Sequence, residues 1–154
     1  MTARTIILAL ALWFTGAAVS LAQSAEVGTW KLNEPVSTIP AGAVKNTTVI
    51  YQEQGETLKI TTDGVTPDGK PIHTEWVGKI DGKDYRVTGN PAEDMRSYRK
   101  IDAHTIELTH KKDGKVVATG QSVVAEDGMS RTLTMHTTDP AGNRLLIVAI
   151  YDKQ

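Results

Sequence analysis

From Thr47 to the C-terminus, apolar and polar residues alternate in short runs. In the run 56–62, Leu58 and Ile60 have polar neighbours, and in the run 131–138 the same holds for Leu133 and Met135. This alternation is typical of β-strands with one buried face. We expect strands at about 47–53, 56–62, 70–80, 83–88, 95–101, 105–111, 115–125, 131–138 and 144–152, with one more around Trp30. The pattern therefore predicts about ten strands.

Turn-forming residues separate these runs. Asp-Gly pairs favour tight hairpins, because both residues tolerate the left-handed backbone of such turns. Five are present: Asp63-Gly64, Asp68-Gly69, Asp81-Gly82, Asp113-Gly114 and Asp127-Gly128. No window of ten residues after Ala25 has the apolar period of a helix, and prolines interrupt the segment 34–46, which we expect to be a long loop.

Consecutive short strands joined by tight turns form a meander, and closure of that meander removes its two exposed edges. We predict an all-β fold: an antiparallel up-and-down meander closed into a barrel of about 8–10 strands, with little or no helix in the mature chain. In this barrel the end of the last strand lies beside Trp30. We therefore expect Lys153 to cover the Trp30 indole through packing and a cation–π contact, so that Trp30 is a structural plug.

The N-terminus has a different pattern. Arg4 precedes the apolar run 6–14, and the small residues of Ser20-Leu21-Ala22 follow, as in a secretory signal. Ala25 offers a second cleavage site. The apolar run is shorter than a membrane span, and the chain has no cysteine to carry a lipid anchor. We expect residues 1–22 to be a signal peptide, residues 23–154 to form one domain, and the protein to be periplasmic or secreted without a stable membrane anchor.

The charge balance and the sequence motifs argue against several classes of function. With 17 Lys and Arg against 18 Asp and Glu, the chain has no basic excess for nucleic acid. It has no signature of nucleophilic catalysis and no phosphate-binding loop, so we expect no enzyme activity, catalytic residue or cofactor. His73 and Glu75 share a strand face, but we expect no metal site and solvated histidines. The carboxylates of Glu93 and Asp94 lie at a turn edge, where solvation is expected.

The alternation also assigns an inner face, and the modest size of its side chains indicates a residual cavity. The inner face is expected to contain Val49, Tyr51, Leu58, Ile60, Ile72, Trp76, Ile80, Tyr85, Val87, Ile106, Leu108, Leu133, Met135, Leu146, Val148 and Ile150. Among these, Tyr51, Trp76, Tyr85 and Leu133 are the expected cavity-lining residues.

Arg99 or Tyr151 is the expected polar anchor for a ligand. Arg99 alternates with Met95, Ser97 and Ile101, so it points inward if Ile101 is internal. An inward arginine needs a partner, such as a ligand carboxylate or a tyrosine hydroxyl. A bulge after Pro91 would turn Arg99 outward instead.

Both ends of the mature chain resemble a known group of barrels. Gly28-Thr29-Trp30-Lys31-Leu32, the Asp-Gly-linked strands and Ile150-Tyr151-Asp152-Lys153 resemble the calycins, most closely the lipocalin-like and fatty-acid-binding-protein-like barrels. The runs 81–85, 99–102 and 151–154 resemble exported bacterial lipocalin-like proteins of unknown function. The resemblance implies a barrel that binds a small apolar molecule, with Gly-x-Trp sealing its base.

The chain departs from fatty-acid-binding proteins at two places. The proline-containing segment 34–46 does not fit their helical lid, and Ala149 stands where their carboxylate-binding Arg-x-Tyr has arginine. We therefore expect an exported, non-catalytic barrel that binds a small, largely apolar molecule in its interior. The alternative is a periplasmic interaction protein, an inhibitor or envelope-assembly factor, that acts through loop 34–46 or loop 89–94 on an unidentified protein partner.

Overall fold

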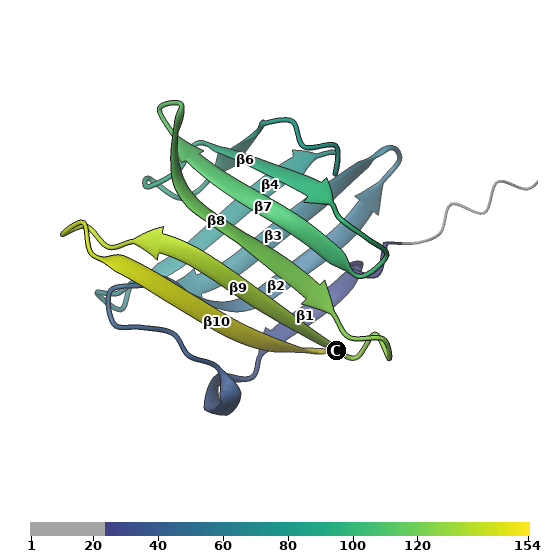
Figure 1. Cartoon of the computed structure of the whole chain (residues 1–154), viewed down its shortest axis with the longest axis horizontal. Helices are drawn as coiled ribbons and strands as arrows, with labels where there is room; N and C mark the ends of the chain where they lie inside the picture. Colours follow the sequence, from purple (N-terminus) through teal and green to yellow (C-terminus); the bar gives the residue numbers. More distant parts are fainter. Residues whose placement is uncertain (1–23) are drawn as a thin grey trace, which may run out of the picture.

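Ten antiparallel strands form this domain (Figure 1). The computed structural model describes residues 24–154; the expected signal peptide, residues 1–22, lies outside them and stays a prediction. The strands are β1 (Gly28–Leu32), β2 (Lys45–Gln54), β3 (Thr57–Val65), β4 (Pro71–Gly78), β5 (Tyr85–Thr88), β6 (Met95–Lys100), β7 (Thr105–Lys112), β8 (Lys115–Val124), β9 (Ser130–Thr138) and β10 (Arg144–Lys153). Within the described residues, the helical structure is one 3-10 turn, η1 (Glu34–Val36).

The sheet closes on itself. Each strand pairs with its neighbours in sequence, and β1 pairs with both β2 and β10, so the order is β1-β10-β9-β8-β7-β6-β5-β4-β3-β2. Trp30 lies opposite Val49 on one side and Lys153 on the other. The predicted all-β meander and its closure into a barrel are confirmed.

Glycines inside two strands allow the sheet to curve. A Cβ atom on Gly64 would lie 2.5 Å from the Lys45 carbonyl oxygen, and one on Gly120 would lie 2.3 Å from the Thr134 carbonyl oxygen. Backbones approach this closely only where a side chain is missing. Asp63-Gly64 is therefore part of β3, and the expected turn there is wrong; the β3–β4 turn uses Asp68-Gly69.

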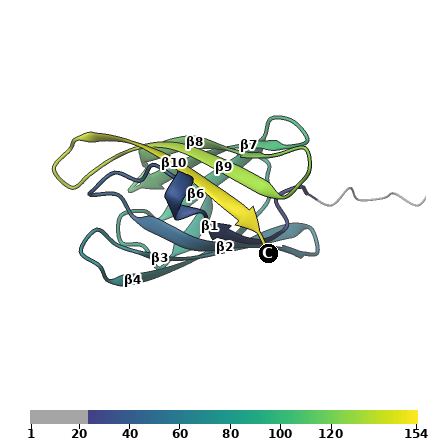
Figure 2. The ribbon, with the colours of Figure 1, turned by 90° about the horizontal axis from the view of Figure 1, so that it is seen from below.

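The face assignment for β10 is also wrong. Leu146 is 47% exposed, whereas Ile147, Ala149 and Tyr151 are buried. This strand is apolar on both faces, so its alternation does not determine which face is inside. The connection after β1 continues along the edge of β10, where Thr38 forms a β-bridge with Val148 (Figure 2).

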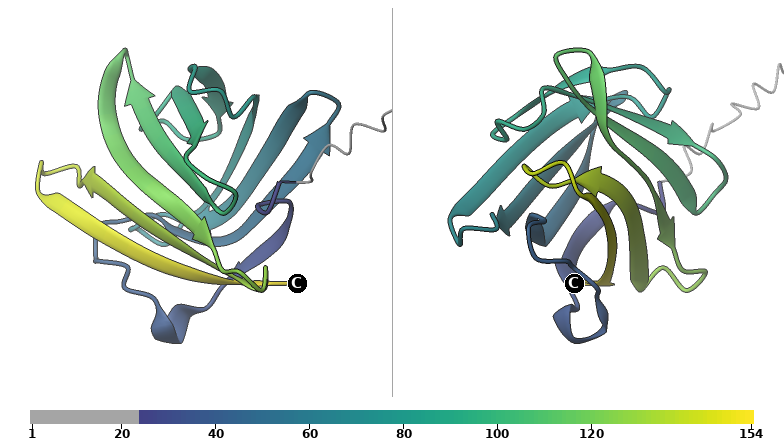
Figure 3. Two further views of the ribbon diagram at one scale, coloured as in Figure 1. Left: turned by 45° about the vertical axis from the view of Figure 1, so that its right-hand side comes forward. Right: turned by 60° about the vertical axis from the view of Figure 1, so that its left-hand side comes forward.

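The two ends of the barrel differ. We call the end with residues 24–27 and the C-terminus the plug end, and the opposite end, which carries connection 33–44, the distal end. At the distal end the β7–β8 and β9–β10 hairpins separate (Figures 1 and 3). Pairing between β8 and β9 stops at Ala118 and Thr137, although β8 begins at Lys115. No helix among residues 24–154 has the length and hydrophobicity that crossing a membrane requires.

Candidate functional site

The plug end is filled by Trp30, which has no exposed surface. Its indole Nε1 donates a hydrogen bond of 2.8 Å to the carbonyl oxygen of Glu26. The Lys153 ammonium lies 5.1 Å from the centre of the ring, which confirms the predicted contact. Because Glu26 precedes β1, the N-terminal segment folds across this end and closes it.

Arg131 is the centre of a buried aromatic cluster at this end. Its guanidinium carbon lies 5.6, 5.1 and 4.5 Å from the ring centres of Trp30, Tyr51 and Tyr151. Arg131 Nη1 donates to the Tyr51 hydroxyl at 2.6 Å and lies 3.6 Å from a carboxylate oxygen of Glu26. The sequence reasoning did not single out Arg131, although it shares the face of Leu133 and Met135 in β9.

Burial dominates the electrostatics of the plug end. It raises the pKa of Glu26, and the nearby Arg131 charge only partly offsets this effect. The pKa of the Tyr51 hydroxyl is also raised by burial. The Glu26 Oε1 and Arg131 Nε atoms are buried without hydrogen-bond partners among residues 24–154. Glu26 and Arg131 are both 2% exposed and pack against the aromatic rings, so they fill the plug end.

A second aromatic group lies on the opposite wall. The Trp76 ring packs edge-on against Tyr85 and Tyr98, with centroids 5.7 and 4.7 Å away. A Cβ atom on Gly78 would collide with the rings of both Trp76 and Tyr85, so glycine is required beneath them. The Trp76 Nε1 donates to the Arg96 carbonyl oxygen at 3.1 Å. The predicted inward direction of Trp76 is confirmed.

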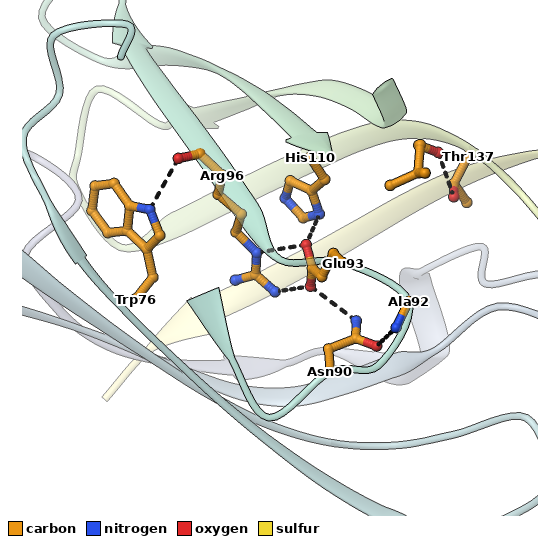
Figure 4. A network of polar contacts seen from close by, with 8 residues as sticks. Trp76, Asn90, Ala92, Glu93, Arg96, His110 and Thr137 are labelled. Atoms are coloured by element: carbon orange, nitrogen blue, oxygen red, sulfur yellow. Dashed lines mark hydrogen bonds and ion pairs between the residues drawn. The ribbon is translucent and has the colours of Figure 1, made fainter. Parts of the chain in front are cut away.

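Polar side chains gather inside the distal half of the barrel (Figure 4). The Glu93 carboxylate, 4% exposed, accepts hydrogen bonds from Arg96 through both Nε (2.9 Å) and Nη2. It also accepts one from Asn90 Nδ2 at 2.9 Å, and His110 Nδ1 lies 2.7 Å away. The expected solvation of Glu93 and His110 is wrong, because the connection between β5 and β6 folds Glu93 inward onto the two strand residues.

The charges of this cluster fix its protonation. Burial alone would raise the pKa of Glu93, but hydrogen bonds from Arg96 and His110 together with the charge of Arg96 outweigh it and hold that pKa well below its usual range. For His110, burial and the adjacent Arg96 cation lower the pKa, and Glu93 only partly opposes them. At neutral pH the cluster therefore contains one anion, one cation and a neutral imidazole.

The strand register extends this cluster into a row along the inner wall. Arg96 lies opposite His110, His110 opposite Ala118, Ala118 opposite Thr137, and Thr137 opposite Leu145. Directly opposite residues share one face of a sheet, so all five point inward. Beside Ala118, Thr137 and Leu145 is a hollow of about 390 Å³ at the point where β8 and β9 separate. We call it the side hollow.

The side hollow is bounded by residues of β8, β9 and β10. Its complete lining is Val116, Val117, Ala118, Thr119, His136, Thr137, Thr138, Arg144 and Leu145. It opens to solvent between the two hairpins and is in the size range of small-molecule sites. Its small inner-wall residues, Ala118 and Thr137, leave space beside the larger Leu145.

Five of the six ligand-binding residues proposed from sequence lie inside the barrel, and the sixth, Arg99, lies outside. Tyr51 and Tyr151 are inside but belong to the plug; the Tyr151 hydroxyl donates to the Asn46 carbonyl oxygen at 3.2 Å. Trp76 and Tyr85 lie together on the opposite wall, and Leu133 is buried in β9.

The inward orientation of Arg99 is wrong. Its side chain is 59% exposed and pairs with Glu107 at 2.7 Å on the outer surface. The prediction depended on an internal Ile101, but Ile101 follows the end of β6 and is 44% exposed. The inward residues of β6 are Arg96 and Tyr98, so the buried cation is three positions earlier than expected.

His73 and Glu75 lie on the outer surface, as expected. His73 Nδ1 is 2.6 Å from Asp63 Oδ1, and its Nε2 is 3.7 Å from Glu75. Lys59 occupies the same Glu75 oxygen at 2.7 Å. Residues 24–154 contain no group of three or more histidine or acidic side chains arranged to hold a metal ion.

Comparisons with known proteins add little beyond the barrel itself. No protein-family model matches the chain, and no curated protein does. Among solved structures, the chain is similar to a redesigned β-barrel, mFAP1, bound to DFHBI. The two share 16% sequence identity with a TM-score of 0.46 over 84% of this chain and 95% of that chain. The strand pairing of residues 24–154 itself defines a ten-stranded antiparallel β-barrel. The function of the protein must be argued from its own side chains.

Proposed function

We propose that this chain is an exported, non-catalytic, calycin-like barrel that binds a small, largely apolar molecule in the distal half of its interior. The observation that carries the proposal is the side hollow, which is continuous with the inward residues Ala118, Thr137 and Leu145. Nearby inner-wall residues Leu108, Leu133 and Met135 are apolar. The hollow itself combines apolar side chains such as Val117 and Leu145 with polar ones such as Thr137 and Arg144, and small-molecule sites commonly join apolar surface to convergent polar groups.

The asymmetry of the barrel supports this placement. At the plug end, Trp30, Arg131 and the surrounding tyrosines fill the interior, with the Arg131 guanidinium packed against the aromatic rings. Toward the distal end, the inward positions 118 and 120 of β8 are alanine and glycine, whose small size leaves more of the interior free. A ligand therefore enters from the side where β8 and β9 separate, and the plug holds the opposite end rigid.

Filling the hollow tests the proposal. Ala118→Phe places a ring at the inner wall, whereas Gln121→Phe places the same ring on the exposed face of the same strand. Nile red fluorescence reports binding of an apolar probe. We expect Ala118→Phe to weaken binding at least tenfold and Gln121→Phe to leave it unchanged, with both variants folded by circular dichroism. Native mass spectrometry of protein from its host should show a co-purified small molecule; absence of both this mass and Nile red binding would overturn the proposal.

A second candidate is an interaction protein that acts through connection 33–44. A hollow of about 440 Å³ lies between this connection and the β3–β4 turn, and Val36 next to it is 56% exposed. A protein partner that requires this surface should be retained by Ala118→Phe and lost by Val36→Glu. A partner that is lost with Ala118→Phe and retained with Val36→Glu favours the interior site instead.

A further inference from the structure

The contact between His110 Nδ1 and Glu93 determines which ring nitrogen of His110 can accept a hydrogen bond. Nδ1 is 2.7 Å from the Glu93 carboxylate, which already accepts hydrogen bonds from Arg96 and Asn90. A carboxylate is only an acceptor, so Nδ1 carries the proton. In the neutral ring, Nε2 is then unprotonated and is a hydrogen-bond acceptor.

This acceptor is accessible. The His110 side chain is 13% exposed. Among residues 24–154, Nε2 has no hydrogen-bond partner. It does not belong to the fully buried polar atoms that lack a partner, so it retains some exposed surface. His110 is the direct neighbour of Ala118 on the inner wall, and Ala118 lines the side hollow. Ala118 has the smallest side chain in this row, so it occupies little of the space between the imidazole and the hollow.

The positive charge of the nearby Arg96 is already balanced by Glu93, which weakens it as an anchor for a second anion. Both Arg96 Nε and Nη2 donate to the Glu93 carboxylate, and the Arg96 side chain is 8% exposed. A ligand carboxylate placed here would meet the Glu93 anion and the lone pair of His110 Nε2. Both interactions are unfavourable unless a proton is taken up.

We propose that the interior selects apolar molecules that carry a hydroxyl or N–H donor, which donates a hydrogen bond to His110 Nε2, and discriminates against their carboxylates. This inference rests on the proposed binding function and specifies the ligand class. Glu93 acts as a positioning residue, because it fixes the imidazole tautomer. Arg96 in turn holds Glu93 ionised.

Three naphthalenes of similar size test the proposal by displacement of Nile red at pH 7.5. 1-Naphthol offers a hydroxyl donor, 1-methoxynaphthalene lacks it, and 1-naphthoate is an anion. We expect 1-naphthol to bind about five- to tenfold more tightly than 1-methoxynaphthalene, as one added hydrogen bond provides. 1-Naphthoate should bind most weakly.

Two substitutions separate the acceptor from its structural support. His110→Asn places an amide near the position of Nδ1, where it can still donate to Glu93, and removes the acceptor. His110→Gln places its amide near the position of Nε2 and restores an acceptor there. We expect the preference for 1-naphthol to disappear in His110→Asn and to return in His110→Gln, with Nile red binding retained in both.

The outcomes distinguish this inference from the proposed function. If Nile red binds but the wild-type protein does not prefer 1-naphthol, or if His110→Asn keeps the preference, the donor specificity is wrong and interior binding stands. Tighter binding of 1-naphthoate would overturn the inference and assign the anchor to Arg96. If no probe binds the wild-type protein, both proposals fail. Should His110→Asn not fold, the wild-type comparison of the three probes still decides.

Discussion

Replacing Trp30 with alanine measures how much the plug contributes to stability. The Trp30 side chain is fully buried, donates a hydrogen bond to the Glu26 carbonyl and lies within 6 Å of the cations of both Arg131 and Lys153. Truncation of a buried tryptophan costs about 3–5 kcal/mol. Loss of the hydrogen bond adds about 1 kcal/mol. Domains of this size have about 5–15 kcal/mol of total stability, so Trp30→Ala removes a large part of it.

Urea denaturation followed by far-ultraviolet circular dichroism provides the assay. With a slope of about 2 kcal/mol per molar urea, a loss of 4 kcal/mol shifts the midpoint by about 2 M. Trp30→Phe is the matched control, since it keeps an aromatic ring and loses only the N–H donor and part of the volume. It should cost less than half as much.

A second control separates packing from general sensitivity to truncation. Val116 is 57% exposed, and Val116→Ala should change stability by less than about 0.5 kcal/mol. If Trp30→Ala destabilises the protein by less than about 1 kcal/mol, Trp30 is not a plug, and the account of the plug end is wrong.

Further predictions concern pH, backbone geometry, the outer surface and processing. Folding lowers the pKa values of Glu93 and His110. The free energy of unfolding should therefore fall as the pH drops below about 6.5, where His110 becomes protonated in the unfolded chain, and more steeply below about 4.5, where Glu93 does. In urea titrations, Glu93→Gln should remove the steeper loss below about 4.5. Gly89 and Gly114 both have positive φ, but only at Gly89 would a Cβ atom collide with backbone, so thermal melts should show Gly89→Ala to be much more destabilising than Gly114→Ala. Arg99→Ala should cost under about 1 kcal/mol by the same melts, because its ion pair is exposed, and a larger loss contradicts its outward placement. N-terminal sequencing of exported protein should begin at Gln23, and an intact Met1 would refute the signal peptide.

The local pattern of the sequence determined the strands and their closure. Alternating residues such as Leu58 and Ile60, together with tight turns between runs, follow from interactions within a few residues. The contact of Trp30 with Lys153 was also predictable, because antiparallel closure brings the first and last strands together. These features depend on periodicity and topology, which a sequence contains directly.

Tertiary structure decided the polar interior. Arg96 and Arg99 differ by three positions, so they lie on opposite faces of β6. The pairing of Arg96 with His110 on the neighbouring strand determines which one is inside. Glu93 lies in a connection and has no alternation to reveal its burial. It becomes a partner of Arg96 and His110 because the fold brings two strands and a loop together, and the gain from satisfying three buried polar groups outweighs solvation of each alone. The sequence by itself therefore determined the barrel, whereas only long-range packing decided which charges its interior contains.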